Sequence, residues 1–333
     1  MVGIGLVGYG SIGRTHARAI AECPRADVVA VCRRAGERPD DLAGDVAVFT
    51  QLGDLASHAE VDVVCVCTPS GLHATQALEA ISHGKHVVVE KPLAVRPADA
   101  REVVRAAQAQ SVSLAVISQR RFEPAARAIK QVVDSGALGR PVLGEALMRW
   151  HRGAAYYDQA AWRGTAADDG GALMNQGIHL VDLLRWFMGP VADVAGVVGT
   201  LIHDIEAEDT AVASLRFKSG GLGVIAVTTA TRPGSPGEVN LFYERGCVGL
   251  TESGITRWDV PGVPAPDAAA GAASGAADPT AIGTLGHVRQ WRDIIESLEA
   301  GRAPSVDGHA GLAALEIVNA VYESDRIGAA VRL

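Results

Sequence analysis

The sequence predicts two domains of different fold class, an α/β domain over residues 1–119 and an α+β domain over residues 120–333. In the first half, apolar runs of strand length alternate with alanine-rich stretches that have helical spacing. After Ser118, apolar runs follow one another with glycine turns between them, which is typical of an antiparallel sheet. A chain of 333 residues is too long for one ordinary core and fits two.

The predicted strands of the first domain are near-continuous hydrophobic runs, as expected when helices cover both faces of a sheet. They occupy residues 3–10, 26–32, 61–67, 85–91 and 112–118. Helical stretches lie between them at residues 11–23, 71–84 and 97–110. Strand and helix repeated in this order predict a doubly wound parallel sheet with right-handed crossovers.

The first turn of this domain, GYGSIG, carries Gly8, Gly10 and Gly13 between a strand and a helix. In that context the first glycine makes the tight turn, the second lets the backbone approach a pyrophosphate, and the third lets the helix pack on the strand. The phosphates would lie at the helix N-terminus, beside Ser11 and Ile12. The motif predicts a dinucleotide site in a Rossmann domain.

The cofactor choice depends on the end of the second strand, about 20 positions after the last motif glycine, where NAD binders usually carry an acidic residue. This sequence has Arg33 and Arg34 there, with Arg38 close behind. Guanidinium groups suit a 2′-phosphate, so we expect NADP in preference to NAD. The alternative is a solvated basic loop after the strand.

Charge and composition narrow the partners. The 30 basic and 38 acidic residues give a formal charge of −8, and no basic block appears, which favours a small-molecule partner over nucleic acid or a membrane surface. The chain opens directly into MVGIGLVGYG, and no apolar run has the length of a membrane span. We expect a cytoplasmic protein.

The cysteine pattern indicates no metal site. Cys65 and Cys67 alternate with valines and so share one face of a buried strand, which is more typical of small core residues than of ligands. Neither a CxxC pair nor an HExxH motif occurs among the 333 residues.

The stretch VVVEKPL, residues 87–93, delivers Glu90 and Lys91 at the end of a core strand and stops at Pro92. An ionised lysine is costly to bury without a partner. Lys91 therefore either extends to solvent along its own stem or is kept for chemistry.

In the second half, residues 120–136 read as a helix that ends at Gly136 and leads into a strand at 142–150. Further strand-like runs lie at residues 191–203, 209–220, 221–231, 238–246 and 247–254, and helices at 287–301 and 310–328 close the chain. The Pro/Gly/Ala/Ser-rich stretch 261–283 predicts a long surface loop, either a lid or an inert insertion.

A second group of polar side chains lies in the apolar stretch LMNQGIHLVDLLRWF. Asn175, His179 and Asp182 follow one another at four and three residues, so all three can share one helix face, and Asp168 or Asp169 is expected to cap the helix. From the residues alone, His179 is either a catalytic group or a satisfied core histidine.

Residues 150–165, WHRGAAYYDQAAWRGT, gather aromatic and basic side chains ahead of that helix. Flat aromatic faces with polar tips suit a sugar or cyclitol ring, although packing between the domains is an equal alternative. The predicted substrate residues here are Trp150, Arg152, Tyr156, Trp162 and Arg163. Together with Arg120 and Arg121, the arginines keep a sugar acid or nucleotide sugar open as substrate.

Several separated motifs resemble the Gfo/Idh/MocA family of oxidoreductases, in order and over nearly the whole chain. They are VGIGLVGYGSIGRTHARAI, CTPSGLHATQALEAISHGKHVVVEKPLA, GGALMNQGIHLVDLLRWFMG and VDGHAGLAALEIVNAVYESDRIG. The resemblance implies a Rossmann domain and then an open, mostly antiparallel sheet whose outer face builds dimers or tetramers, so we expect a homo-oligomer.

The resemblance also assigns roles. Lys91 matches the lysine that lies near the nicotinamide and the reacting hydroxyl, with a cis peptide at the following proline, and His179 matches the usual proton acceptor. Asn175 stands where inositol dehydrogenases carry Asp, and an amide can orient a hydroxyl but cannot act as a base. By resemblance His287 is expected to reach the pocket. The predicted cofactor-binding residues are Gly8, Gly10, Ser11, Ile12, Gly13, Arg33, Arg34, Thr68, Pro69, His73, Glu90 and Lys91.

The sequence thus predicts an oxidoreductase that transfers a hydride between a secondary hydroxyl of a sugar, anhydrosugar or cyclitol and NADP or NAD. His179 would take the hydroxyl proton, Lys91 would stabilise developing alkoxide charge, and Asn175 would position a neighbouring hydroxyl. Two alternatives are a redox glycosidase that keeps NAD bound and a regulator that senses dinucleotide without turnover; imine-reducing or biliverdin-reductase-like relatives complete the range.

Overall fold

The computed structural model describes residues 1–34, 38–266 and 283–333. The chain forms two compact units. The first unit comprises Met1–Gln119 and Thr284–Ala313, and the second comprises Arg120–Gly283 and Ala314–Leu333. The predicted division placed everything after residue 119 in the second domain, whereas Thr284–Ala313 returns to the first. Most of the predicted loop 261–283 lies outside the described residues.

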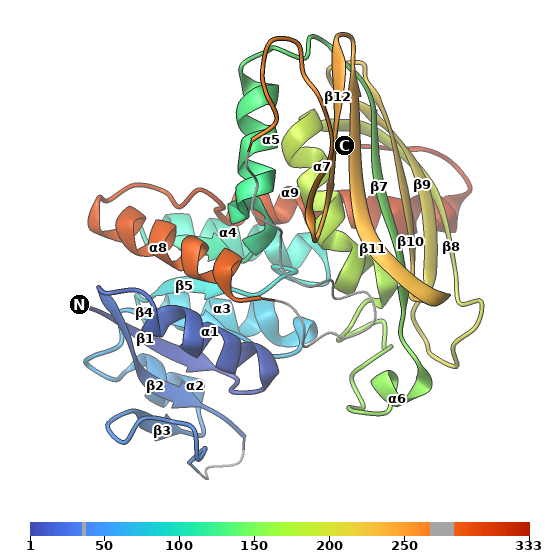
Figure 1. Cartoon of the computed structure of the whole chain (residues 1–333). Helices are drawn as coiled ribbons and strands as arrows, with labels where there is room; N and C mark the ends of the chain where they lie inside the picture. Colours follow the sequence, from blue (N-terminus) through green and yellow to red (C-terminus); the bar gives the residue numbers. More distant parts are fainter. Residues whose placement is uncertain (35–37, 267–282) are drawn as a thin grey trace. The chain divides into compact units, whose positions relative to one another are not determined.

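The first unit is built on a parallel sheet whose strand order is β3-β2-β1-β4-β5-β6, which is the doubly wound arrangement that the sequence predicts (Figure 1). Valine-rich stretches form its strands because both faces are covered. The strands are β1 Val2–Val7, β2 Ala26–Cys32, β3 Ala47–Phe49, β4 Val63–Val66, β5 His86–Val89 and β6 Leu114–Val116. The edge strand β3 was not predicted, because its three apolar residues make a run too short to tell from a loop.

Helices pack on this sheet. One of them, α8, explains why Thr284–Ala313 belongs to the first unit. Val288, Trp291, Ile294 and Ile295 of α8 join the same buried cluster as residues of β1 and β4. The apolar face of α8 therefore has its partner in this unit rather than in the second. The helices are α1 Ser11–Ala21, α2 Leu52–Ala56, α3 His73–Ser82, α4 Pro97–Ala109 and α8 Leu285–Glu299, with the 3-10 turn η1 Ser70–Leu72 before α3.

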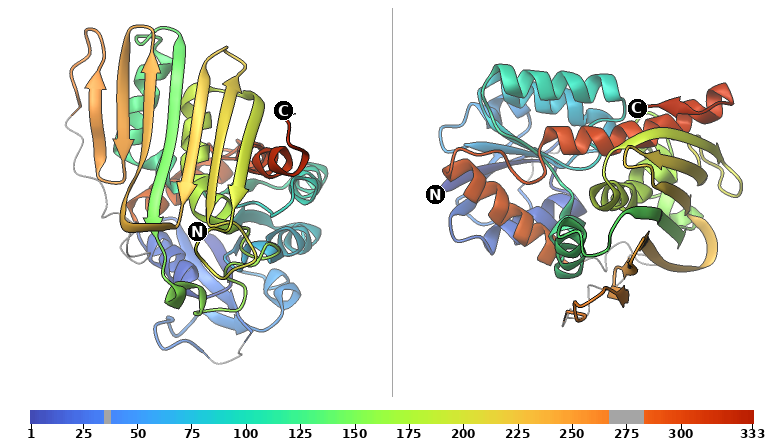
Figure 2. Two further views of the ribbon diagram at one scale, coloured as in Figure 1. Left: turned by 90° about the vertical axis from the view of Figure 1, so that its right-hand side faces the viewer. Right: turned by 90° about the horizontal axis from the view of Figure 1, so that it is seen from above.

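The second unit contains an eight-stranded sheet of order β13-β12-β11-β7-β10-β9-β8-β14 (Figure 2). Its pairs are antiparallel except β10 with β7, which run parallel. Along β9 the side chains alternate between exposed and buried, so one face is in the core and the other is open. The strands are β7 Pro141–His151, β8 Val191–Gly199, β9 Thr210–Phe217, β10 Leu222–Thr228, β11 Ala230–Tyr243, β12 Gly246–Thr251, β13 Gly254–Asp259 and β14 Val331–Arg332.

A helix packs against one face of this sheet. Residues Ala172–Gly177 form a π-helical turn, η3, and continue into α7, Ile178–Met188, which contacts β7 and β11. The remaining elements are the 3-10 turn η2 Gln119–Phe122, α5 Pro124–Asp134, α6 Ala154–Tyr157 and the long α9 Gly308–Ile327.

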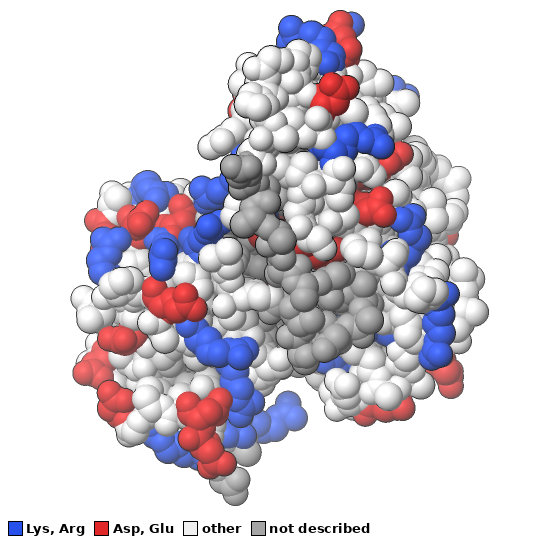
Figure 3. Space-filling view, in the orientation of Figure 1, with Lys and Arg blue, Asp and Glu red and all other residues white. Residues whose placement is uncertain are grey.

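Side chains of both charge signs lie scattered over the face drawn in Figure 3. Within the described ranges, no helix combines the length and apolar character that crossing a membrane requires.

Candidate functional site

The glycine turn after β1 has the geometry that its motif predicts. Gly8 has φ +93°, and a Cβ there would lie 2.8 Å from the Cys67 carbonyl oxygen. A Cβ at Gly13 would lie 2.2 Å from the Gly8 oxygen, so helix α1 can pack this closely only on glycine. Gly10, the N-cap of α1, would place a Cβ in open space. The open approach at Gly10 and the exposed start of a helix are what a pyrophosphate needs, so the turn fits a dinucleotide.

The basic residues after β2 behave differently from one another. Arg33 is tied through its backbone N–H to the Phe49 carbonyl at 3.0 Å, and Arg34 is exposed. Arg38 instead donates to the carbonyls of Val46 and Ala43, so its guanidinium is used to fold the following loop. Arg33 and Arg34 thus follow directly after β2, whereas the Arg38 guanidinium serves the loop.

Thr68, Pro69 and His73 lie at the carboxyl end of β4, next to the glycine turn. The buried His73 ring has Nδ1 2.7 Å from the Pro92 carbonyl oxygen and Nε2 2.8 Å from the Thr68 carbonyl oxygen. It thereby joins the ends of β4 and β5. Burial lowers the pKa of His73, while its two carbonyl contacts oppose that shift.

Glu90 connects the core to Lys91. Its Oε2 accepts from the backbone N–H of Lys91 at 3.0 Å, and its Oε1 lies 2.8 Å from His16 Nε2. The Trp291 indole donates to His16 Nδ1 at 2.9 Å. An indole can only donate, so Nδ1 is unprotonated and Nε2 carries the hydrogen that is given to Glu90. Burial alone would raise the pKa of Glu90, yet this hydrogen bond holds it at about 2.

The expected cis peptide is present between Lys91 and Pro92. The prediction that His287 reaches a substrate pocket is not supported, because its ring is buried beside His16, with centroids 5.3 Å apart. Burial lowers the pKa of His287 to about 4, so it is neutral. A helix with 3.6-residue periodicity places His287 on the same face as Trp291, and that face packs into the core.

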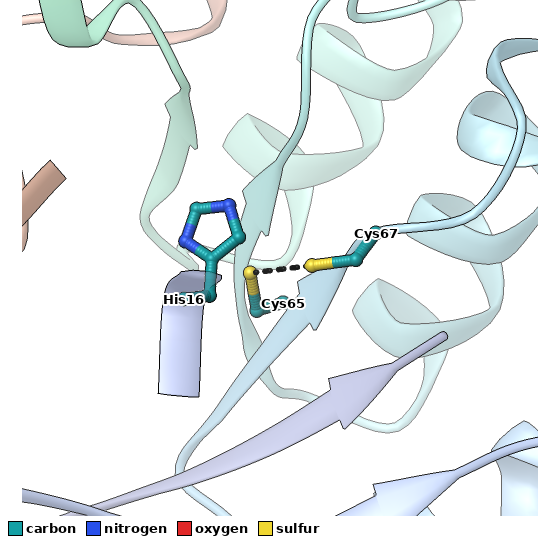
Figure 4. A group of neighbouring side chains, drawn as sticks. All are labelled: His16, Cys65 and Cys67. Atoms are coloured by element: carbon teal, nitrogen blue, oxygen red, sulfur yellow. Dashed lines mark hydrogen bonds between the residues drawn. The ribbon is translucent and has the colours of Figure 1, made fainter. Parts of the chain in front are cut away.

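Two groups of side chains in this core have spacings that a metal ion could bridge. Cys65, Cys67 and His16 form one, with the two sulfurs 3.5 Å apart and the imidazole beside them (Figure 4), and His16, Glu90 and His287 form the other. Both groups depend on His16, whose two ring nitrogens are already engaged by Trp291 and Glu90. A metal would have to displace one of those bonds. The cysteines are small core residues on one strand face, as the sequence predicts.

In the second unit, the π-helical turn and α7 present two side chains. From residue 171 to residue 184, Asn175 and His179 are the two that are partly exposed, and the rest are buried. The predicted shared face therefore holds for these two, but Asp182 is buried in an ion pair with Arg121, with Oδ2 to Nε at 2.7 Å. Asp182 is a structural residue.

The expected aspartate cap is wrong. The segment has Gly171 as N-cap with no side-chain cap, and the backbone N–H of Leu173 is bound by the Glu208 carboxyl at 2.7 Å. Asp169 turns the other way: it accepts from the Gly164 N–H at 2.7 Å and from the Asn175 amide Nδ2. Gly170 and Gly171, at φ +81° and +87°, make this reversal.

The predicted substrate residues around 150–165 form a cluster on Tyr156. The Arg163 guanidinium lies 4.1 Å from the Tyr156 ring centroid and 4.8 Å from that of Trp162, and Arg152 lies 5.4 Å from Tyr156 and 4.8 Å from Trp150. Burial lowers the pKa of Arg152, and the Arg163 charge acts in the same direction. Arg120 and Arg121 do not join the cluster, because they pair with Glu252 and Asp182.

Sequence reasoning missed the residues that hold this cluster together. Gln176 donates to the Tyr156 hydroxyl at 3.1 Å, and Asp169 ties the 150–165 segment to Asn175. Gln176 lies next to Asn175 in the quoted motif, but an α-helical reading directs it to another face. The π-helical turn, with more residues per turn, was the missing information.

Comparisons with known proteins agree with this architecture. Residues 2–118 match the model of the oxidoreductase family with an NAD-binding Rossmann fold, and residues 126–248 match that of the GFO/IDH/MocA C-terminal domain. The WlbA dehydrogenase from Bordetella pertussis, solved with NADH and UDP-GlcNAcA, is 36% identical, with a TM-score of 0.89 over 100% of this chain and 98% of that one.

Two curated relatives are more distant. D-apiose dehydrogenase of Paraburkholderia graminis is 27% identical over 336 residues, covering 98% of this chain and 88% of the relative. Myo-inositol 2-dehydrogenase of Thermotoga maritima is 28% identical over 251 residues, covering 73% of each. The two matched models, the full-length likeness to a dehydrogenase and the glycine turn followed by the EKP segment place the chain in the Gfo/Idh/MocA family of oxidoreductases.

Proposed function

We propose that the protein is an NAD(P)-dependent dehydrogenase that oxidises a secondary hydroxyl on the sugar ring of a nucleotide-linked sugar acid. This is narrower than the sugar, anhydrosugar or cyclitol that the sequence predicts. The observation that carries the proposal is the pair of guanidinium groups around Tyr156, in a chain that resembles, over its whole length, a dehydrogenase solved with NADH and UDP-GlcNAcA.

The chain supplies three groups for the reaction. His179, which with Asn175 is partly exposed in the otherwise buried stretch 171–184, would take the proton of the hydroxyl. Lys91, whose backbone is fixed by Glu90, would stabilise negative charge on the same oxygen. The Asn175 amide, whose Nδ2 donates to Asp169, would position a neighbouring substrate hydroxyl. The nicotinamide, when bound, supplies the hydride acceptor.

The basic cluster favours an anionic substrate over a neutral one. The described residues place no carboxylate within ion-pair distance of Arg163, and its Nε is buried without a hydrogen-bond partner. Burying part of a guanidinium group is unfavourable unless an acceptor completes its hydrogen bonds. A carboxylate or a diphosphate would bind a guanidinium fork through two hydrogen bonds.

The cofactor is a nicotinamide dinucleotide, and we propose that Arg33 and Arg34 favour NADP. The support is the pair of guanidinium groups at the end of β2, where a 2′-phosphate would lie. The NADH bound in the Bordetella pertussis structure belongs to that protein, and a direct comparison of both cofactors decides the choice here.

We also propose that the protein is a homo-oligomer formed through the outer face of the second sheet. Val197 and Val212 are cross-strand partners that are 63% and 47% exposed, and Leu222, two strands from β8, is 48% exposed on the same face. An apolar face of this kind is unusual on a monomer. In sedimentation velocity, Val212→Glu should lower the mass of the main species, and an unchanged mass would overturn the assignment.

The test of function is reduction of NAD and NADP by purified protein, followed by nicotinamide absorbance. UDP-GlcNAcA is compared with UDP-GlcNAc, which keeps the diphosphate but lacks the sugar carboxylate, and with myo-inositol. We expect turnover with UDP-GlcNAcA. Arg163→Gln should raise the KM for this substrate by roughly 10- to 100-fold, which corresponds to the loss of a hydrogen bond to a charged group.

Arg140→Gln serves as the matched control, because Arg140 is an exposed arginine that pairs with Glu244 at the surface. Turnover of myo-inositol but not of the acid would disprove the nucleotide-sugar assignment and keep the dehydrogenase. Cofactor binding with no reduction on any substrate would favour the redox glycosidase or the sensor.

A further inference from the structure

The carboxyl group of Glu208 lies where a helix cap would be expected, although it comes from a distant part of the chain. Glu208, which directly precedes Asp209 and β9, is buried, and its Oε1 accepts from the Leu173 backbone N–H at 2.7 Å. A Cβ on Gly171 would lie 1.7 Å from its Oε2. The carboxyl therefore occupies the space that any side chain at residue 171 would need.

The hydrogen atoms available for hydrogen bonds around Glu208 indicate whether its carboxyl group is protonated. The Tyr322 hydroxyl oxygen lies 2.7 Å from the Gly170 carbonyl oxygen and 3.0 Å from Glu208 Oε1. A carbonyl can only accept, so the single phenol proton serves Gly170. The contact between Tyr322 and Glu208 is then favourable only if Glu208 donates.

Burial supports the same state. It raises the pKa of Glu208 to about 8, and the charge of Asp169 acts in the same direction, whereas the Leu173 N–H opposes the shift. The positive end of the helix dipole also favours an anion, by about 0.3–1 kcal/mol, which is small beside the cost of burying a charge. Tyr322, the other titratable group in contact, is itself kept neutral by burial, which raises its pKa well above the usual range.

We propose that Glu208 is held as a neutral carboxylic acid and acts as a positioning residue for the segment that carries Asn175 and His179. It donates to Tyr322, Tyr322 donates to Gly170, and the Leu173 N–H donates to Glu208, so the main chain on both sides of Gly171 is fixed. Asp169, directly before these glycines, then holds the Asn175 amide. The role assigned to Asn175 and His179 rests on the proposed function, but the protonation state of Glu208 does not.

The first test is spectroscopic and needs no substrate. Infrared difference spectra of wild type and Glu208→Gln at neutral pH should show a carboxylic-acid C=O band that the variant lacks, and the band should vanish as pH rises through about 8. Glu206→Gln is the matched control, because Glu206 is exposed and binds the Ala166 N–H. Absence of a difference band would show that Glu208 is ionised and would overturn the proposal, whether or not the protein turns over any sugar.

The second test is kinetic. Glu208→Ala should lower kcat by roughly 10- to 100-fold, as expected for a small misplacement of catalytic groups, with little change in the KM of the cofactor. Glu208→Gln, whose amide can serve either Tyr322 or the Leu173 N–H at the position of Oε1 but not both, should recover part of that loss. It should also lack the fall in kcat that wild type shows above pH of about 8. Equal kcat losses in both variants, or identical pH profiles for wild type and Glu208→Gln, would contradict the positioning role.

Discussion

The Trp291 indole N–H donates to His16 Nδ1 at 2.9 Å, and this bond determines which ring nitrogen faces Glu90. Because Glu90 in turn accepts from the backbone of Lys91, a tryptophan in the C-terminal part of the chain sets the orientation of the lysine segment. Closely packed cores transmit such constraints because side chains have few alternative arrangements.

Trp291→Phe should therefore lower stability and turnover together. The substitution keeps most of the ring volume but removes the donor, so it leaves a buried acceptor on His16 and should lower the free energy of unfolding by about 1–3 kcal/mol. Urea unfolding gives the first quantity and kcat the second. Trp258→Phe is the control, since the Trp258 indole donates to the Val263 carbonyl at an exposed position. Equal losses of stability and of kcat in the two variants would contradict the connection from Trp291 through His16 and Glu90 to Lys91.

The Arg121–Asp182 ion pair predicts a large stability effect without a catalytic role for Asp182. Both side chains are buried, and their two contacts measure 2.7 and 2.5 Å. Removing one partner leaves a buried charge, so Arg121→Ala should cost about 3–5 kcal/mol in chemical denaturation. Arg140→Ala at the exposed Glu244 pair should leave the unfolding midpoint nearly unchanged. Similar losses of unfolding free energy in the two variants would show that the buried ion pair does not stabilise the fold more than the exposed one.

The hydrogen bonds to Asp209 should make the stability of the second unit sensitive to acid. Burial alone would raise its pKa, but the backbone N–H groups of His203, Leu201 and Ile202 hold it at about 2. A depressed folded pKa gives stability that is complete above the ordinary value of 3.8 and is lost as pH falls toward about 2. The unfolding free energy of Asp209→Asn should fall less over that window than that of wild type. Asp204→Asn, at an exposed position, should behave like wild type; if Asp209→Asn does too, the assignment fails.

The two arginines after β2 predict cofactor choice. Replacing Arg33 with Asp and Arg34 with Ala should raise the KM for NADP much more than the KM for NAD, because only NADP carries a 2′-phosphate. Arg38→Ala is the control, since its guanidinium binds main-chain carbonyls of the following loop. An equal change for both cofactors would show that the pair is a solvated basic loop.

The Rossmann strands were predictable because buried parallel strands have continuous apolar sequences. The glycine turn was predictable because the spacing of its glycines reflects backbone geometry. The sequence could not assign Thr284–Ala313 to the first unit, since an amphipathic helix does not say which core its apolar face will meet. The parallel pairing of β10 with β7 was likewise hidden, because alternation along a strand is the same whichever way its neighbour runs.

At the candidate site, Asn175 and His179 were visible as polar residues in an apolar helix. Their supports were not. Glu208 and Tyr322 reach Gly170 and Leu173 from 35 or more positions away in sequence, a distance at which local periodicity carries no information. Long-range hydrogen bonds of this kind appear only once the chain has folded.

The most direct measurement is the pH profile of kcat for His179→Gln beside wild type, with UDP-GlcNAcA and the better cofactor. If His179 takes the hydroxyl proton, kcat should fall by roughly 10²- to 10⁴-fold. The pH profile of the variant should also lack the fall in kcat on the acidic side, which protonation of the histidine causes in wild type. Wild-type turnover across the whole pH range would contradict the account.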